Sequence, residues 1–181
     1  KNIRPVDDVL TGLHINEFVA ISGQVYPDEF GSFSDWIEVY NSNSLSINLG
    51  GLYFSNDEND LTKHRIPINA PQHTTIPAKG YAVFRADALP QLGTLHLGFE
   101  IASQGGSLFL SQLFNGTVFR LDEVYYSVQE TDISYGRAPD GSSNWEFFAT
   151  ATPGARNSGN SSLRLDALSK APIVFPNPAS D

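Results

Sequence analysis

The sequence predicts an all-β fold, in which antiparallel strands pack as a sandwich with Greek-key connections. From residue 13 to about residue 149, short runs rich in β-branched and aromatic residues alternate with clusters of Gly, Pro, Asn, Asp and Ser. Since no segment of 11 residues carries a helical apolar stripe, we expect little helix and no crossover helices for a parallel sheet. Hydrophobic residues make up 40% of the 181 residues and aromatic residues 12%, which is enough apolar area for one core. A closed barrel is the alternative architecture.

The expected strands follow from these runs. They cover residues 13–21, 35–40, 47–55, 64–67, 81–86, 107–113, 117–126, 133–137 and 144–149. Asn115-Gly116 lies between two of them and suits a type I′ turn, so residues 107–126 are expected to form a hairpin. Two further turns are expected at Pro77-Ala78-Lys79-Gly80 and at Pro139-Asp140-Gly141.

Composition divides the chain into four parts. We expect an N-terminal lead-in at 1–10, a sandwich domain at 11–157, a polar linker at 158–170 and a separate C-terminal segment at 171–181. Residues 151–157 are expected to close the domain as a strap, because a polar stretch with nothing to bury begins at Ser158.

Charge and composition exclude several classes of partner. Eleven Lys and Arg against 20 Asp and Glu give a net charge of −9, which repels nucleic acid and anionic lipid. No apolar run approaches the roughly 18 residues that a membrane span needs. The chain has no Cys, so it can hold neither a disulfide nor a thiolate zinc site. The stretch from Lys1 to Pro5 is not apolar, so any export signal is expected to have been removed.

A series of short motifs in order resembles the bacterial lamin-tail domain. The motifs are Leu13-His14-Ile15-Asn16-Glu17-Phe18, Asp35-Trp36-Ile37-Glu38-Val39-Tyr40-Asn41, Leu49-Gly50-Gly51-Leu52-Tyr53-Phe54, Ala78-Lys79-Gly80-Tyr81-Ala82-Val83-Phe84, Phe99-Glu100-Ile101-Ala102, Gly105-Gly106-Ser107-Leu108, Asp122-Glu123-Val124, Ser134-Tyr135-Gly136-Arg137 and Thr152-Pro153-Gly154-Ala155-Arg156-Asn157. The resemblance covers roughly residues 11–157 and implies an immunoglobulin-like sandwich. His64 departs from it, because many bacterial relatives carry Trp at this position.

The C-terminal stretch from Ile173 to Asp181, with its Pro-Asn-Pro-Ala-Ser-Asp ending, is similar to the first strand of the type A sorting domain of the type IX secretion system. That system belongs to Bacteroidetes. The resemblance implies export to the outer-membrane surface or the medium, and a natural protein that continues beyond Asp181. The other interpretation of this stretch is a Pro-rich linker.

Acidic residues form the one constellation with a chemical interpretation. Strict alternation over residues 13–21 puts Glu17 on the same face as four apolar residues, where a carboxylate needs a partner. Glu38 shares a face with Trp36 and Tyr40 in the same way. Asp28 and Asp35 lie in and after the loop that joins these two strands.

Three interpretations of these acids stay open. Glu17 could pair with Arg137 or Arg156, or accept backbone amides at the edge of the sandwich. Glu17, Asp28, Asp35 and Glu38 are candidate ligands for Ca²⁺, which prefers hard oxygen ligands. Two of them could also act as the acid pair of a glycosidase.

No catalytic constellation is visible in the sequence. The four His residues show no metal-binding spacing, and no Ser stands in a Gly-x-Ser-x-Gly elbow. We therefore expect no enzymatic activity and no cofactor, and Ca²⁺ at the four acids is the one candidate ion. The expected function is that of a monomeric structural or binding module of an exported multidomain protein, with a protein or a surface glycan as its partner. A carbohydrate-binding or accessory module of a secreted hydrolase or nuclease is the alternative, and exposed Trp and Tyr side chains on one sheet face would favour it.

Overall fold

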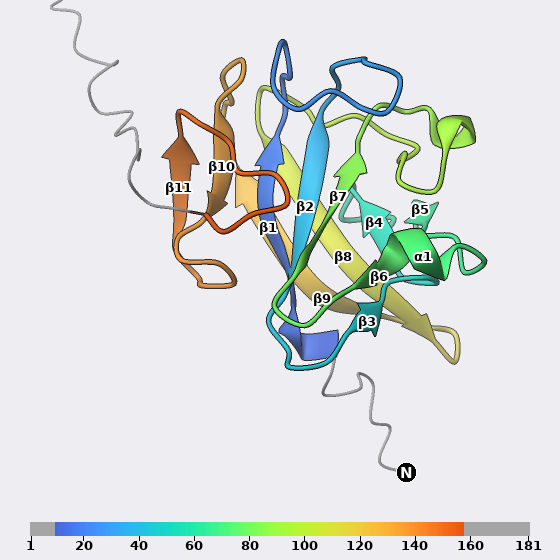
Figure 1. Cartoon of the computed structure of the whole chain (residues 1–181). Helices are drawn as coiled ribbons and strands as arrows, with labels where there is room; N and C mark the ends of the chain where they lie inside the picture. Colours follow the sequence, from blue (N-terminus) through green and yellow to red (C-terminus); the bar gives the residue numbers. More distant parts are fainter. Residues whose placement is uncertain (1–9, 158–181) are drawn as a thin grey trace, which may run out of the picture.

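In the computed structural model, which describes residues 10–157, two antiparallel sheets lie face to face (Figure 1). The front sheet has the strand order β11-β10-β1-β2-β7, and the back sheet has the order β5-β4-β8-β9. A third, two-stranded sheet joins β3 to β6 at one side. The fold class expected from the sequence, an all-β sandwich, is therefore confirmed. Its immunoglobulin-like Greek-key order remains a prediction.

The strands are β1 (Leu13–Val19), β2 (Trp36–Asn41), β3 (Ile47–Asn48), β4 (Tyr53–Ser55), β5 (His64–Arg65), β6 (Thr75–Ile76), β7 (Tyr81–Arg85), β8 (Gly106–Phe114), β9 (Thr117–Tyr126), β10 (Ser134–Arg137) and β11 (Trp145–Phe148). The helical pieces are short: η1 (Leu10–Gly12), α1 (Pro71–Thr74) and η2 (Pro90–Leu92). Each expected strand thus has a counterpart. The expected strand at 47–55 is interrupted by a turn at Gly51, whose φ of 92° suits glycine, and β6 was not expected.

The turn chemistry predicted the longest hairpin correctly. Strands β8 and β9 pair up to Phe114 opposite Thr117, and Asn115 and Gly116 between them have φ values of 49° and 78°. The expected turns are also present, since the amide of Gly80 donates to Pro77 O at 3.0 Å and that of Ser142 donates to Pro139 O at 3.0 Å.

The core fills the space between the two sheets. Its buried members include Leu13, Ile15 and Phe18 of β1, and Leu108 and Leu110 of β8 belong to the same cluster. Other elements supply Ile37, Val39, Ile47, Leu49, Leu52, Phe54, Ile66, Ile76, Phe84, Leu97, Phe99, Ile101, Val124 and Tyr126. The core members run from Leu13 to Tyr126, and Tyr135 and Trp145 pack against them, so the two sheets share one core.

A β-bulge in β1 corrects the alternation that the sequence predicts. The pairing of β1 with β2 shifts by one residue between Ile15 and Glu17, so Asn16 is the extra residue. Leu13 and Ile15 face the core before the bulge and Phe18 faces it afterwards. Strict alternation predicted that Glu17 shares a face with Leu13 and Ile15. This prediction is wrong, because the bulge shifts the register between Ile15 and Glu17. Glu17 lies on the outer face of the front sheet, and it is nevertheless 0% exposed.

The strap, residues 151–157, covers this outer face over β1 and β2 (Figure 1). The loop at 20–35 covers the same face further along, where Tyr26 packs against Trp36 with ring centroids 6.1 Å apart. Arg85 of β7 holds this loop, because its guanidinium donates to Tyr26 O and Pro27 O at 2.5 and 2.7 Å. The loop is thus fixed to the sheet beneath it.

Candidate functional site

Two of the four acids expected in the site form a pair. Glu17 of β1 stands opposite Glu38 of β2 in the strand register, and both side chains are fully buried. A buried carboxylate is costly unless hydrogen-bond donors compensate it. The donors around the two acids therefore decide what the pair can do.

Glu17 accepts hydrogen bonds from the strap and from β10. The amide of Thr152 lies 3.1 Å from each carboxylate oxygen, and Thr152 Oγ1 lies 3.0 Å from Oε2. Ser134 Oγ donates to Oε1 at 2.5 Å. The carboxylate accepts a backbone amide and two hydroxyls, which agrees with the amide alternative expected for Glu17.

Glu38 is bonded by the same strap. The amide of Gly154 donates to its Oε2 at 2.6 Å, and Asn16 Nδ2, on the bulge, donates to its Oε1 at 3.0 Å. Asn16 Nδ2 also lies 3.1 Å from Asp140 Oδ1, which connects the pair to the turn after β10. The bulge residue thus bridges Glu38 and Asp140.

Asn157 fastens the end of the strap. Its Nδ2 donates to Asn16 O at 3.2 Å and to Arg137 O at 2.8 Å, and its backbone amide donates to Asp140 Oδ1 at 2.9 Å. Thr152 Oγ1 lies 2.9 Å from Asn157 Oδ1. The Ser-Tyr-Gly-Arg and Thr-Pro-Gly-x-x-Asn motifs therefore meet around one buried acid pair. We call this pair, Glu17 and Glu38, the acid clasp.

Burial dominates the ionisation of the clasp. It raises the pKa of Glu38 to about 8, with Glu17 and Asp140 nearby adding to the shift against the hydrogen bonds from Asn16 and Gly154. Burial also raises the pKa of Glu17, although the hydrogen bonds from Ser134 and Thr152 oppose it. The raised pKa of Glu38 favours its protonated form, which reduces the repulsion between two like charges.

The Arg partners considered for Glu17 lie elsewhere. Arg137 forms a two-pronged ion pair with Asp122, with Nη2 2.9 Å from each carboxylate oxygen. Arg156 is exposed at the surface of the strap. The arginine alternative for Glu17 is thus wrong, because the strap and Ser134 already supply its donors.

Asp28 and Asp35 do not join the clasp. Asp28 Oδ1 caps its own loop by accepting the amides of Phe30 and Ser32, both at 2.8 Å. Asp35 Oδ2 accepts the amide of Ile101 at 3.2 Å, and burial raises the pKa of Asp35 to about 6. Within residues 10–157, no group of three or more His, Cys, Asp or Glu side chains is arranged to hold a metal ion.

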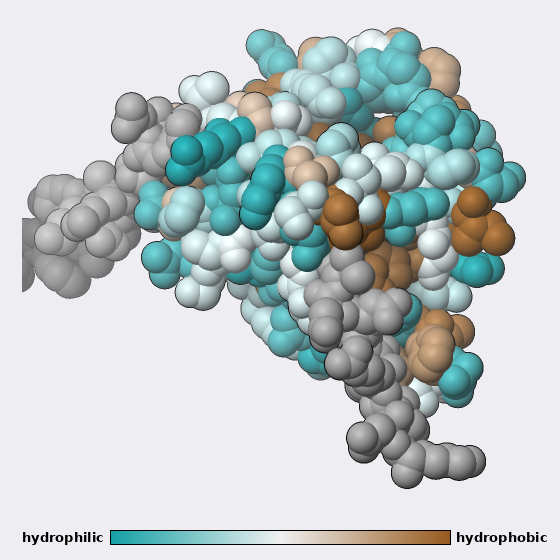
Figure 2. Space-filling model, turned by 60° about the horizontal axis from the view of Figure 1, so that its bottom comes forward, coloured by the Kyte–Doolittle hydropathy of each residue, from teal (hydrophilic) through white to brown (hydrophobic). Residues whose placement is uncertain are grey.

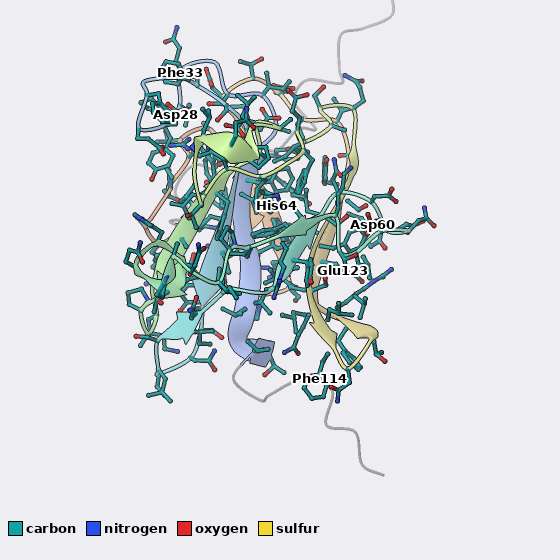
Figure 3. The ribbon with its side chains drawn as sticks, turned by 90° about the vertical axis from the view of Figure 1, so that its right-hand side faces the viewer. Asp28, Phe33, Asp60, His64, Phe114 and Glu123 are labelled. Carbon is teal, nitrogen blue, oxygen red and sulfur yellow. The ribbon has the colours of Figure 1, made fainter. Side chains whose placement is uncertain are left out.

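Asp28 and Asp35 instead line a cavity of about 390 Å³ at the loop end of the sandwich. Its lining comes from the loop at 20–35 and from residues 86–100, and it consists of Ala20, Ile21, Ser22, Asp28, Ser32, Phe33, Ser34, Asp35, Ala86, Asp87, Leu89, Leu92 and Glu100. We call it the loop-end pocket. Figure 3 shows Asp28 and Phe33 at this end, far from Phe114 at the tip of the β8–β9 hairpin.

Residues 86–100 form the second wall of the loop-end pocket, opposite the loop at 20–35, and hydrogen bonds hold this wall in place. Asp87 Oδ2 lies 2.6 Å from Nδ1 of the buried His96, whose Nε2 lies 3.3 Å from Glu29 Oε1. Asp87 Oδ1 also accepts the amide of Leu89 at 3.0 Å. The carboxylates of Asp28, Asp35 and Asp87 are therefore fixed in place before any ligand arrives.

A second, shallower cavity of about 340 Å³ lies beside the strap on the outer face of the front sheet. It is lined by Tyr40, Lys79, Tyr81, Pro139, Asp140 and Arg156. The rings of Tyr40 and Tyr81 lie 5.1 Å apart, and Tyr81 donates its hydroxyl proton to Asp140 Oδ2 at 2.6 Å. We call it the tyrosine pocket.

Sequence reasoning singled out the clasp acids but not the residues of the second pocket wall. The stretch between β7 and β8 has η2 as its only regular element, so it shows no hydrophobic periodicity. Periodicity therefore could not single out Asp87, Leu89, Leu92 and Glu100. The Pro139-Asp140-Gly141 signal did predict the turn at Asp140, but it does not show where the carboxylate points. Spacing alone therefore could not predict either cavity.

No helix of residues 10–157 is long and apolar enough to span a membrane. Comparison of the chain with protein-family models, with curated proteins and with solved structures finds no significant match. The likeness to the lamin-tail domain therefore rests on the motifs alone.

Proposed function

We propose that this chain is a non-catalytic binding module of an exported multidomain bacterial protein, and that it binds a protein partner in the loop-end pocket. The loop-end pocket is the observation that carries the proposal. Apolar side chains and carboxylates line one cavity there, and its volume falls within the roughly 300 to 1,000 Å³ of ligand-binding pockets. Arg85 ties the loop at 20–35 to the sheet, and hydrogen bonds fix Asp87 on the opposite side, so the pocket exists before a ligand binds.

The acid clasp supports a structural role for the residues that most resembled a catalytic pair. Both carboxylates are enclosed, and amides and hydroxyls of the same chain already occupy them. A glycosidase pair must reach a sugar and a water molecule. The clasp instead fixes the strap, so we assign it to stability.

The remaining parts of the proposal rest on sequence. Export to the outer-membrane surface or the medium is inferred from residues 173–181, and the polar linker at 158–170 suggests a tether to further domains. These segments lie outside the described residues. We propose that the module is monomeric.

The second candidate function is carbohydrate binding, which the tyrosine pocket favours. Tyr40 and Tyr81 lie side by side there with Lys79, Asp140 and Arg156, and sugars bind to aromatic rings flanked by polar groups. The two Trp residues do not favour it, since Trp36 is buried and Trp145 is half-buried against Phe18 and Tyr135.

NMR titration of the uniformly ¹⁵N-labelled chain distinguishes the two candidates. We expect a randomised tetrapeptide mixture to shift amide resonances in residues 20–35 and 86–100. Oligosaccharides from bacterial and plant cell walls are expected to leave the spectrum unchanged. Shifts confined to Tyr40, Lys79 and Tyr81 with the oligosaccharides would replace the first candidate with the second, and no shifts with either would overturn both.

A further inference from the structure

We infer that the loop-end pocket takes a short segment of a partner protein in which an Arg or Lys side chain stands next to an apolar one. This inference rests on the proposed function and names the chemistry of the partner. It follows from the charges, the apolar wall and the rigidity of the pocket.

The charge of the lining is entirely negative. Four carboxylates contribute to it, from Asp28, Asp35, Asp87 and Glu100, and no Lys or Arg does. Negative charges gathered in one concave site make the local potential more negative and attract a cation. An acidic segment would add negative charge to a lining that carries no Lys or Arg.

The apolar part of the lining makes a free inorganic cation a poor fit. Ala20, Ile21, Phe33, Leu89 and Leu92 share the pocket with the carboxylates. Phe33, Leu89 and Leu92 are 44%, 42% and 40% exposed, so a ligand that covers them removes apolar surface from water. The aliphatic stem of Arg or Lys fits such a wall while its charged head reaches the carboxylates.

The size of the cavity suggests more than one side chain. A cavity of about 390 Å³ has room for a basic side chain and an apolar neighbour. Phe30, at the same end, is 62% exposed and lies 6.2 Å from the His96 ring, which extends the apolar surface beyond the lining. The pocket therefore binds two neighbouring side chains of the partner, one basic and one apolar.

Glu100 offers the cleanest test of the charge. Asp28, Asp35 and Asp87 each accept a hydrogen bond that holds a loop, whereas the exposed Glu100 side chain lies on the rim. Glu58, an exposed glutamate in the turn before β5, gives the matched control for the same charge change. Leu45, which is 67% exposed outside the pocket, gives the matched control for Leu92.

The experiment titrates the ¹⁵N-labelled 181-residue chain with acetylated, amidated Gly-Arg-Leu-Gly and with versions that carry Gln or Glu in place of Arg, or Gly in place of Leu. We expect only the Arg-Leu peptide to shift residues 20–35 and 86–100 strongly. Glu100→Gln should weaken its binding about three- to fivefold and Leu92→Ser about five- to tenfold, with no change for Glu58→Gln or Leu45→Ser. Raising the salt from about 0.05 to about 0.5 M should weaken binding further.

Equal binding of the Gln peptide, or of the Gly peptide, would overturn the inference. Binding that Glu100→Gln leaves unchanged would also overturn it. If the randomised peptide mixture shifts the loop-end resonances while the Arg-Leu peptide does not, the binding function stands and the basic-apolar class fails. If neither the peptide mixture nor the Arg-Leu peptide shifts these resonances, both the proposed function and the inference fail.

Discussion

Folding favours the protonated form of Glu38. Its pKa is about 8 in the folded chain because the side chain is buried beneath the strap, against an ordinary value of 4.5. Between these two pH values the folded state binds a proton that the unfolded state has lost. The contribution of Glu38 to stability is therefore fully present below about pH 4.5 and is lost as pH rises to about 8.

Glu38→Gln tests this ionisation. At pH 5 the variant should be less stable than the natural chain by on the order of 1 kcal/mol, because its side-chain amide cannot accept from both Asn16 and Gly154. At pH 8.5 the difference should vanish or reverse, since Gln never ionises. Urea unfolding at both pH values measures the effect, and Glu58→Gln serves as the exposed control. An equal difference at the two pH values would contradict the assignment.

Glu17 shows what a sequence pattern can and cannot predict about a single residue. Alternation drew attention to Glu17, and the need for compensating donors was correct. The identity of the donors was not settled by pattern, because Asn16 is a bulge and moves Glu17 to the outer face. Thr152 is 135 residues away in sequence, so only the folded chain shows that its amide meets Glu17.

The strap is the element that the clasp holds in place. Thr152 connects its start to Glu17 and to its own end at Asn157. This hydroxyl is partly buried between the strap and β1, so removing it takes away a hydrogen-bond donor at that point.

Thr152→Val should destabilise the chain by about 1 to 3 kcal/mol, because it removes the hydroxyl that lies within hydrogen-bond distance of both Glu17 Oε2 and Asn157 Oδ1. Thr150→Val, at an exposed position next to the strap, makes the same substitution without these contacts and should be nearly neutral. Thermal unfolding compares the two variants. Similar melting temperatures for both would show that the hydroxyl does not support the strap.

Strand positions were predictable to within a few residues because pattern and turn chemistry agree locally. The β8–β9 hairpin is the clearest case, with Asn115 and Gly116 at positive φ between two long alternating runs. Strand β6 escaped prediction because Thr75–Ile76 is too short to show a period. Helices were expected to be scarce, and α1 is a single turn.

The molecule as a whole was predictable as an all-β sandwich, whereas its cavities were not. The loop-end pocket depends on how the loop at 20–35 folds against residues 86–100, and loops carry no periodicity. Its anchors, Arg85 on Tyr26 and Pro27, are contacts of a side chain with carbonyl groups 58 and 59 residues away. Only the assembled sandwich brings them together.

Ca²⁺ is not expected to stabilise the folded chain. The oxygens of Glu17 and Glu38 face N–H and O–H donors, which present positive charge where a cation would have to sit. Adding about 5 mM Ca²⁺ should shift the thermal midpoint by less than about 1 °C. A rise of several degrees that EDTA reverses would show that Glu17, Asp28, Asp35 or Glu38 does bind the ion.

The fastening of Asn157 also has a mechanical meaning. Through one side-chain amide, the last described residue is bonded to Asn16 of β1, near the first described residues. A pull applied between the two ends of residues 10–157 therefore runs along β1 and across this amide. Residues 20–35 and 86–100 lie outside that line, so tension on the module would load the clasp before it reached the pocket.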